Sequence, residues 1–372
     1  MTDDALPEPD RIDGAPHPRD APHIIGQNIA QAAFLEAYNS DHLHHAWLIT
    51  GPRGTGKATL AWAIARFLLA TPADDGGMFG APPPVETLSI SDDHPVSRRM
   101  RARSESGLFV LRRPYDEKTK RLRQQITVDE ARKMKGFFNF SATDGGRRVV
   151  IIDAADEMNV PAANAILKIL EEPPANTTIL MIAHQPSALL PTIRSRCREL
   201  RLAPLSDDDI AKVLEQCDID SQGQTDALAA LAAGSAGEAV RLCLLGGPAI
   251  YAELIRIFET LPRLDRPRAL SLADSAAARG AEDRRELLAV LTDLFLARLA
   301  ITGATGRPPT PEAAPGEAAL LSRLAPNAHE ARKWAIAAQE IGARARHGRA
   351  VNLDPAALIL DTLFRIQKTA AA

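Results

Sequence analysis

The stretch Gly51-Pro-Arg-Gly-Thr-Gly-Lys-Ala-Thr59 decides the fold of this 372-residue chain. It follows the apolar run 46–50 (AWLIT) and precedes the helix-forming run 58–70 (ATLAWAIARFLLA). A strand, a glycine-rich turn and a helix in this order are the context of a phosphate-binding loop, whose pattern is G-x-x-x-x-G-K-[ST]. The pattern predicts that Gly51, Gly54 and Gly56 let backbone N–H groups approach phosphates and that Lys57 reaches the same phosphates.

One position of the loop departs from the pattern. Ala58 stands where a serine or threonine hydroxyl would hold Mg²⁺. Thr59 is the next residue along the helix, about 100° further round its axis, and is poorly placed to replace the missing ligand. A self-sufficient ATPase, with Thr59 supplying the hydroxyl, is the alternative that this argument leaves open.

The acid expected opposite the loop is Asp153. It ends the β-branched run 147–153 (RRVVIID), and phosphate-loop proteins keep the acid that orients Mg²⁺ at the end of such a strand. We therefore expect a vestigial nucleotide site that binds ATP or ADP without turnover and consists of Gly51, Gly54, Gly56, Lys57, Thr59 and Asp153.

The rest of the pattern predicts an α/β domain followed by helices. Strands are expected at 107–111, 147–153 and 178–183, and helices at 127–138 and 161–172, which indicates a doubly wound, mostly parallel sheet. Beyond Pro204 the pattern is helical, with a small unit at 206–248 and a larger one at 249–372. Residues 1–22 are acidic and proline-rich and are predicted to be a disordered tail.

Composition indicates a soluble cytoplasmic protein. Hydrophobic residues make up 45% and charged residues 24% of the chain, as in ordinary globular proteins. Cys197, Cys217 and Cys243 are too few and too widely spaced for a disulfide framework or a metal cluster. His42, His44 and His45 lack an acid or cysteine at ligand spacing, so we expect no metal there. Nothing resembles a signal peptide or a membrane span.

Residues 98–135 carry 13 lysines and arginines against five acids, although the net charge of the chain is −3. Such a segment could contact DNA phosphates or an acidic protein face. A solvated charged surface is an equally good interpretation. A DNA-binding adaptor that uses this segment is therefore a second alternative function.

Two further stretches carry a resemblance to a known family. The runs 164–174 (NAILKILEEPP) and 190–197 (LPTIRSRC), with 23–27 (HIIGQ) and 45–51 (HAWLITG), resemble the clamp-loader branch of the AAA+ proteins in bacterial DNA polymerase III. The resemblance covers about residues 23–205. It implies an AAA+ domain at 23–205, a helical lid at 206–248 and an oligomerisation collar at 249–372. The implied partners are gamma/tau and delta subunits and, through the complex, the sliding clamp and primed DNA.

The resemblance also gives roles to single residues. In the Ser195-Arg196-Cys197 motif it implies that Arg196 is an arginine finger, which reaches the γ-phosphate of ATP bound to a neighbouring subunit. The competing interpretation is that Arg196, like Arg194 and Arg198, is a solvated charge. In hydrolysing AAA+ proteins a glutamate that activates water follows the strand acid, but here Ala154 does. Asp156 and Glu157 lie too far along the chain to replace it.

Other positions of the implied family pattern are altered as well. Ala183 or His184 stands at the first sensor, and Gly237 or Glu238 replaces the arginine of the second. The four cysteines that usually bind zinc in this branch are missing from residues 71–110, where His94 alone cannot form a zinc site. The sequence therefore predicts a non-hydrolysing subunit without zinc.

Overall fold

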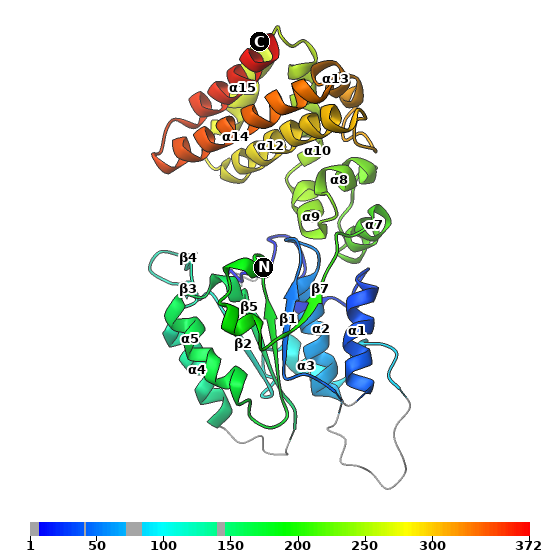
Figure 1. Cartoon of the computed structure of the whole chain (residues 1–372), viewed down its shortest axis with the longest axis vertical. Helices are drawn as coiled ribbons and strands as arrows, with labels where there is room; N and C mark the ends of the chain where they lie inside the picture. The colour runs from blue at the N-terminus through cyan, green and yellow to red at the C-terminus, as the bar shows by residue number, and fades with distance from the viewer. Residues whose placement is uncertain (1–6, 41, 72–83, 140–145) are drawn as a thin grey trace. The chain divides into compact units, whose positions relative to one another are not determined.

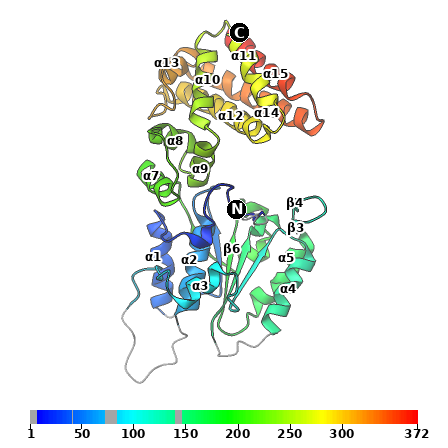
Figure 2. The same cartoon turned by 180° about the vertical axis from the view of Figure 1, so that it is seen from behind.

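The computed structural model describes residues 7–40, 42–71, 84–139 and 146–372, which divide into two compact units. Unit 1 contains the described residues up to Cys217 together with Ser235–Gly237, and unit 2 contains Asp218–Gly234 and Glu238–Ala372 (Figures 1 and 2). The division falls inside the stretch 206–248 that the sequence suggested as one small helical unit. Residues 206–217 and 235–237 of that stretch belong to unit 1, and the rest belongs to unit 2 with the C-terminal helices.

A five-stranded parallel sheet forms the centre of unit 1, with the strand order β2-β5-β6-β1-β7. This confirms the predicted doubly wound α/β fold. Every residue of β1 and β6 is buried, as expected for strands covered on both faces. The strands are β1 Ala46–Thr50, β2 Leu108–Arg112, β5 Arg148–Asp153, β6 Thr177–Ile182 and β7 Arg198–Arg201.

Helices cover both faces of this sheet (Figure 1). Alternate residues of β5 point to opposite sides, so Val149 and Ile151 belong to one hydrophobic core, and Val150 and Ile152 to the other. The first core is closed by α1 Asn28–Asn39, α2 Lys57–Ala70 and α3 Pro95–Arg101, and the second by α4 Val128–Asn139 and α5 Val160–Glu171.

Shorter elements connect these layers. The hairpin of β3 Tyr115–Asp116 and β4 Arg121–Leu122 follows β2, and α6 Pro191–Arg194 precedes β7. Helix α7 Asp207–Gln216 begins at Ser206, whose hydroxyl accepts a hydrogen bond from the Asp209 N–H. Three short 3₁₀ helices complete the described part of the unit: η1 Pro18–Asp20, η2 Ala155–Glu157 and η3 Pro186–Ala188.

The N-terminal tail is ordered from residue 7 onward, so the prediction of a disordered segment over 1–22 was wrong for its described part. Glu8, His17 and Arg19 are buried, and η1 lies within the segment. Composition predicted disorder because the segment has few large apolar side chains. The ordering comes from ion pairs to distant elements of unit 1. Residues 1–6 lie outside the described residues.

Unit 2 is helical, as the sequence predicted. Its core includes a buried network in which Glu317 accepts hydrogen bonds from Tyr251 Oη (2.6 Å) and from Arg298 Nε (2.7 Å) and Nη2 (3.0 Å). The Ala313 N–H also donates to Glu317 at 2.7 Å, so the buried carboxylate is fully partnered. The helices are α8 Thr225–Ala232, α9 Ala236–Leu244, α10 Gly247–Glu259, α11 Arg266–Ala277, α12 Glu282–Thr305, α13 Glu317–Leu324, α14 Ala328–Ala350 and α15 Pro355–Ala371.

One helix among the described residues, α12, is long and apolar enough to cross a membrane, with a mean hydropathy of 1.8. It packs against α14, α13, α10 and α11 and carries the buried, ion-paired Arg298. These contacts are those of the core helix of a folded domain, and we assign it that role.

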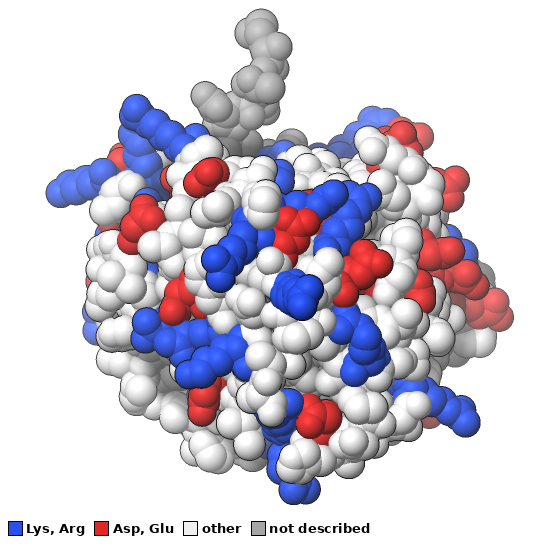
Figure 3. Space-filling view, turned by 90° about the horizontal axis from the view of Figure 1, so that it is seen from above, with Lys and Arg blue, Asp and Glu red and all other residues white. Residues whose placement is uncertain are grey.

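On the face shown in Figure 3, basic and acidic side chains are interspersed rather than separated by sign.

Candidate functional site

The candidate site lies at the edge of the sheet where the parallel strands end. The phosphate loop follows β1, Asp153 ends β5, and His184 follows β6 shortly after its last residue. Because the carboxyl ends of parallel strands share one edge, these residues are brought together. Gly51 has a φ of 135°, and a Cβ there would lie 2.6 Å from the Leu202 carbonyl oxygen, so the loop can start only with glycine.

Lys57 is turned toward its own loop. Its Nζ donates hydrogen bonds to the carbonyl oxygens of Gly51 (2.8 Å) and Pro52 (2.5 Å). Burial lowers the pKa of Lys57 to about 8, although Asp153 and Asp156 act in the opposite direction. Burial therefore disfavours the charged form of this ammonium group, and two carbonyl oxygens of the loop accept hydrogen bonds from it.

Asp153 is held in an environment that disfavours its charged form. Burial raises its pKa to about 7, and the negative charges of Asp10 and Glu157 act in the same direction, against the attraction of Arg112 and Lys57. A carboxyl group must be deprotonated to ligate a metal. Asp153 is thus where the sequence placed it, in surroundings that favour its protonated form.

The two acids beyond Ala154 have structural partners. Asp156 accepts hydrogen bonds from the backbone N–H groups of His184 (3.1 Å) and Gln185 (2.9 Å). Glu157 forms an ion pair with Arg113 Nε at 2.6 Å. These contacts agree with the expectation that neither acid replaces the missing glutamate.

Both sensor positions lie at the loop. The pKa of the half-buried His184 falls to about 4, first because of desolvation and then because of the nearby Lys57, so its imidazole is neutral. The Gly237 N–H donates to the Gly54 carbonyl oxygen at 3.0 Å. A Cβ on Gly237 would lie 3.1 Å from Gly54 Cα and 3.2 Å from Ile12 Cδ1. A side chain at position 237 would therefore be crowded by Gly54 and Ile12.

Thr59 is placed apart from these groups. It lines a cavity of about 120 Å³ together with Ile24, Gln31 and Arg66, and the described lining includes neither Lys57 nor Asp153. The expected site therefore assembles around Gly51, Gly54, Gly56, Lys57 and Asp153, and Thr59 faces elsewhere.

Arg196 is held at the end of α6 by two partners. Its Nη1 donates to the Thr192 carbonyl oxygen, and its Nη2 pairs with Glu171 Oε1, each at 2.8 Å. The side chain keeps 34% of its surface exposed. The structure thus joins the two stretches 164–174 and 190–197, because Glu171 ends the helix of the first and Arg196 belongs to the second.

The neighbours of Arg196 have structural roles. Ser195 Oγ donates to the Thr192 carbonyl oxygen at 3.2 Å, and Cys197 Sγ donates to that of Ile193 at 3.2 Å. Burial raises the pKa of the Cys197 thiol to about 12, so it is no nucleophile at neutral pH. An open cavity of about 450 Å³ next to the motif is lined by Leu48, Pro186, Pro191, Arg194, Ser195, Cys197 and Glu199.

The basic segment 98–135 is spread over α3, β2, the β3–β4 hairpin and α4 rather than gathered into one strip. Nine of its 13 cations form ion pairs, several with acids outside the segment such as Glu8 and Glu157. This arrangement favours a structural use of the charges over a DNA-binding surface. The nine are Arg98, Arg99, Arg101, Arg103, Arg112, Arg113, Arg123, Arg132 and Lys133.

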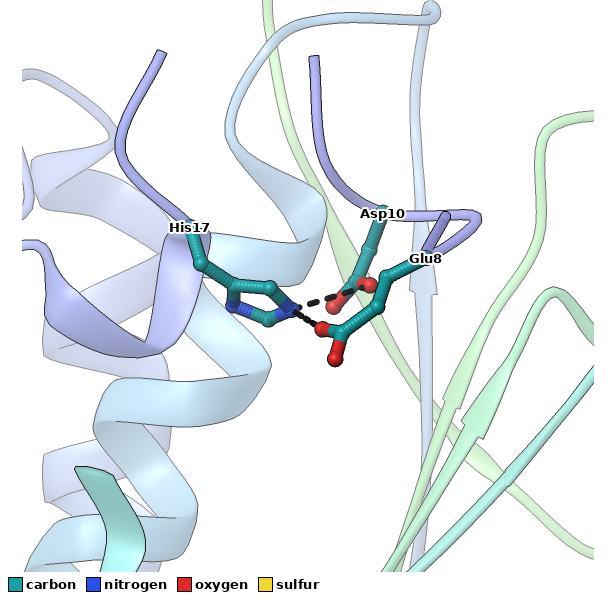
Figure 4. A group of neighbouring side chains, drawn as sticks. All are labelled: Glu8, Asp10 and His17. Atoms are coloured by element: carbon teal, nitrogen blue, oxygen red, sulfur yellow. Dashed lines mark ion pairs between the residues drawn. The ribbon is translucent and has the colours of Figure 1, made fainter. Parts of the chain in front are cut away.

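A buried ionic cluster in the N-terminal segment was missed by the sequence analysis. His17 Nε2 lies 2.5 Å from Glu8 Oε2 and 3.2 Å from Asp10 Oδ1, and Figure 4 shows the imidazole pointing at both carboxylates. Such a trio can bind a metal ion, but Arg19 and Arg112 already contact these carboxylates. The charges are therefore balanced by the protein. The charged, proline-rich sequence contains no motif from which this packing could have been predicted.

Comparisons with known proteins fit this geometry. The family model described as "DNA polymerase III, delta subunit" matches residues 26–206. The chain is 43% identical over 155 residues to DNA polymerase III subunit delta' of Pseudomonas aeruginosa, covering 41% of each protein. It is 32% identical over 208 residues to the subunit of the same name in Escherichia coli, covering 56% of this chain and 57% of the relative.

One solved structure is also similar to this chain. It is a DNA polymerase III gamma subunit-related protein of Thermotoga maritima, 19% identical, with a TM-score of 0.44 and 91% of this chain covered. The chain spans about half the length of the curated relatives that it matches.

Proposed function

We propose that this chain, whose residues 26–206 match the family model described as "DNA polymerase III, delta subunit", is the delta-prime-type subunit of a clamp loader in the bacterial cytoplasm. Its partners would be gamma/tau and delta subunits, and through the complex it would act on the sliding clamp and primed DNA. Relatives named as delta' and gamma/tau subunits of DNA polymerase III support this assignment.

The proposed subunit acts without hydrolysing ATP itself. Three observations support this. Ala58 offers no hydroxyl to Mg²⁺, both acids beyond Ala154 are engaged elsewhere, and Gly237, packed closely against Gly54, carries no sensor arginine. A missing general base alone costs about 10²–10⁴-fold in rate. Any ATP or ADP at this site would be bound without turnover.

The active contribution of the subunit would be Arg196, acting in trans. The observation that carries this proposal is a partly exposed guanidinium group fixed by Glu171 and the Thr192 carbonyl oxygen. An arginine finger stabilises the charge of phosphoryl transfer and contributes roughly 10³–10⁵ to turnover at the site it completes. A pre-oriented guanidinium group is suited to that task because little side-chain freedom is lost on binding.

The test is the ATPase rate of the complex reconstituted with gamma/tau, delta, clamp and primed DNA. We expect Arg196→Ala to leave assembly intact and to lower this rate severalfold. The remaining ATPase rate would come from the nucleotide sites of the complex that Arg196 does not contact. Arg194→Ala is the matched control, since Arg194 is an exposed arginine two residues away. Equal rates for the two variants at saturating clamp and DNA would contradict the proposal.

The isolated chain separates this function from the enzyme alternative. We expect no steady-state ATP hydrolysis above background. Turnover that disappears in Lys57→Ala would instead favour a self-sufficient ATPase, because Lys57 is the phosphate-loop lysine.

A further inference from the structure

The N-terminal segment, defined here as residues 8–20, lies outside the residues that match the family model and is nevertheless tightly bound to unit 1. Its side chains contact elements that are far away in the sequence. Glu8 pairs with Arg103 at 2.7 Å and with Arg112 at 3.0 Å. These contacts anchor the start of the segment to the end of β2 and to the residues that follow α3.

The same segment is anchored to α2, the helix that begins at the phosphate loop. Trp62 Nε1 donates a hydrogen bond to Asp10 Oδ2 at 3.0 Å, and the Arg66 guanidinium group donates to the Arg19 carbonyl oxygen. His17 meets the Trp62 ring edge-on, with 5.5 Å between the ring centroids. The side chains of Glu8, Asp10 and His17 are at most 4% exposed, so the segment is packed into the unit rather than resting on its surface.

This packing brings the segment to the phosphate-loop edge at two points. Asp10 pairs at 3.3 Å with Arg112, the β2 residue in register with Asp153. Ile12 Cδ1 would lie 3.2 Å from a Cβ on Gly237, the residue whose N–H is bonded to Gly54. Asp10 therefore contacts the strand neighbour of the acid that would orient Mg²⁺, and Ile12 borders the contact between the loop and the second-sensor segment.

Both contacts oppose a nucleotide. Arg112, the β2 residue in register with Asp153, is already paired with Glu8 at 3.0 Å and with Asp10 at 3.3 Å, so its charge is engaged by the N-terminal segment rather than offered to a phosphate group. A nucleoside next to Gly54 would compete for space with Ile12 and with the Ser235–Gly237 segment. The N-terminal segment thus engages a cation and adds apolar bulk where a nucleotide would need a free cation and open space.

We propose that the N-terminal segment is an intramolecular occupant of the phosphate-loop edge and that nucleoside di- and triphosphates bind only when it is displaced. The inference rests on the proposed nucleotide-type site but not on the role of Arg196. The Glu8–Asp10–His17 cluster, with Arg19, Arg103 and Arg112, is the latch that holds the segment in place.

The proposal predicts a measurable affinity difference. When only a fraction of molecules has the segment displaced, the apparent Kd equals the intrinsic Kd divided by that fraction. If the segment is displaced in about a tenth of the molecules or fewer, freeing it tightens nucleotide binding by about tenfold or more.

The experiment titrates fluorescent mant-ADP into three proteins: the full chain, a chain lacking residues 1–20, and the full-length Glu8→Gln/Asp10→Asn variant. The double variant keeps the chain intact and tests the latch even where the deletion fails to fold. We expect both altered proteins to bind at least about tenfold more tightly than the full chain, and Lys57→Ala to abolish the gain. Equal affinities, no binding by any protein, or a gain that survives Lys57→Ala would overturn the proposal.

Hydrogen exchange of the unaltered chain gives an independent measurement. Saturating ADP should accelerate amide exchange in residues 8–20, because the bound nucleotide displaces them. Bound ADP without faster exchange in this segment would also overturn the proposal. Neither measurement involves partner subunits, so a negative result here leaves the clamp-loader function standing, and failure of the Arg196 test leaves this inference standing.

Discussion

Replacing Asp153 by asparagine should stabilise unit 1 at alkaline pH. The pKa of Asp153 rises from its ordinary value of 3.8 to about 7, mainly through burial and the charge of Asp10. At 1.36 kcal/mol per pKa unit, ionising this group in the folded protein costs about 4 kcal/mol above pH 7. The new amide requires a hydrogen-bond partner, which takes back about 1–2 kcal/mol. The net gain expected at pH 8 is therefore about 2–3 kcal/mol.

The gain should depend on pH with a definite sign. An acid whose pKa is raised on folding binds its proton more tightly in the folded state, so stability falls as pH rises from about 4 to about 7. At pH 5 the folded carboxyl group of Asp153 is protonated, and the cost that asparagine removes shrinks to about 2 kcal/mol. After the amide correction the variant and the parent should be about equally stable at pH 5.

The assay is native-state hydrogen exchange of the β5 and β6 amides, which reports on unit 1 within the intact chain. Asp13→Asn serves as the control, because Asp13 is an exposed aspartate. The same stability gain at pH 5 and pH 8, or none at pH 8, would show that Asp153 is not held in an environment that disfavours its charge.

Three further predictions concern other parts of the molecule. Glu317→Ala leaves Arg298 buried without its carboxylate and should destabilise unit 2 by about 3–5 kcal/mol in exchange of the α12 amides; a loss below about 1 kcal/mol would refute this. Asn159→Ala removes the cap that accepts from the Ala162 N–H and should cost unit 1 about 1 kcal/mol, whereas an unchanged stability would mean that the cap is not needed. The isolated chain should show no salt-dependent binding to primed DNA; binding that weakens in Lys118→Glu/Lys120→Glu would restore the DNA-adaptor alternative.

Local sequence patterns were sufficient to predict the fold of the first unit. In the run 46–70 the glycine-rich turn requires a strand before it and a helix after it, and the apolar run that ends at Asp153 is typical of a buried strand. The losses at Ala58 and Ala154 could also be recognised from the sequence, because residue identity alone shows that a hydroxyl or a carboxylate group is missing. The Ser195-Arg196-Cys197 motif was likewise a local signal.

The surroundings of these residues could be learned only from the folded structure. The Glu171 partner of Arg196, the raised pKa of Asp153 and the approach of Gly237 to Gly54 all depend on contacts between distant parts of the chain. The N-terminal segment is the clearest case. Its composition predicts disorder, but hydrogen bonds to α2 and ion pairs to β2 order it. Ion pairs between segments leave no periodic trace in a sequence, because their energy depends on burial and distance rather than on spacing.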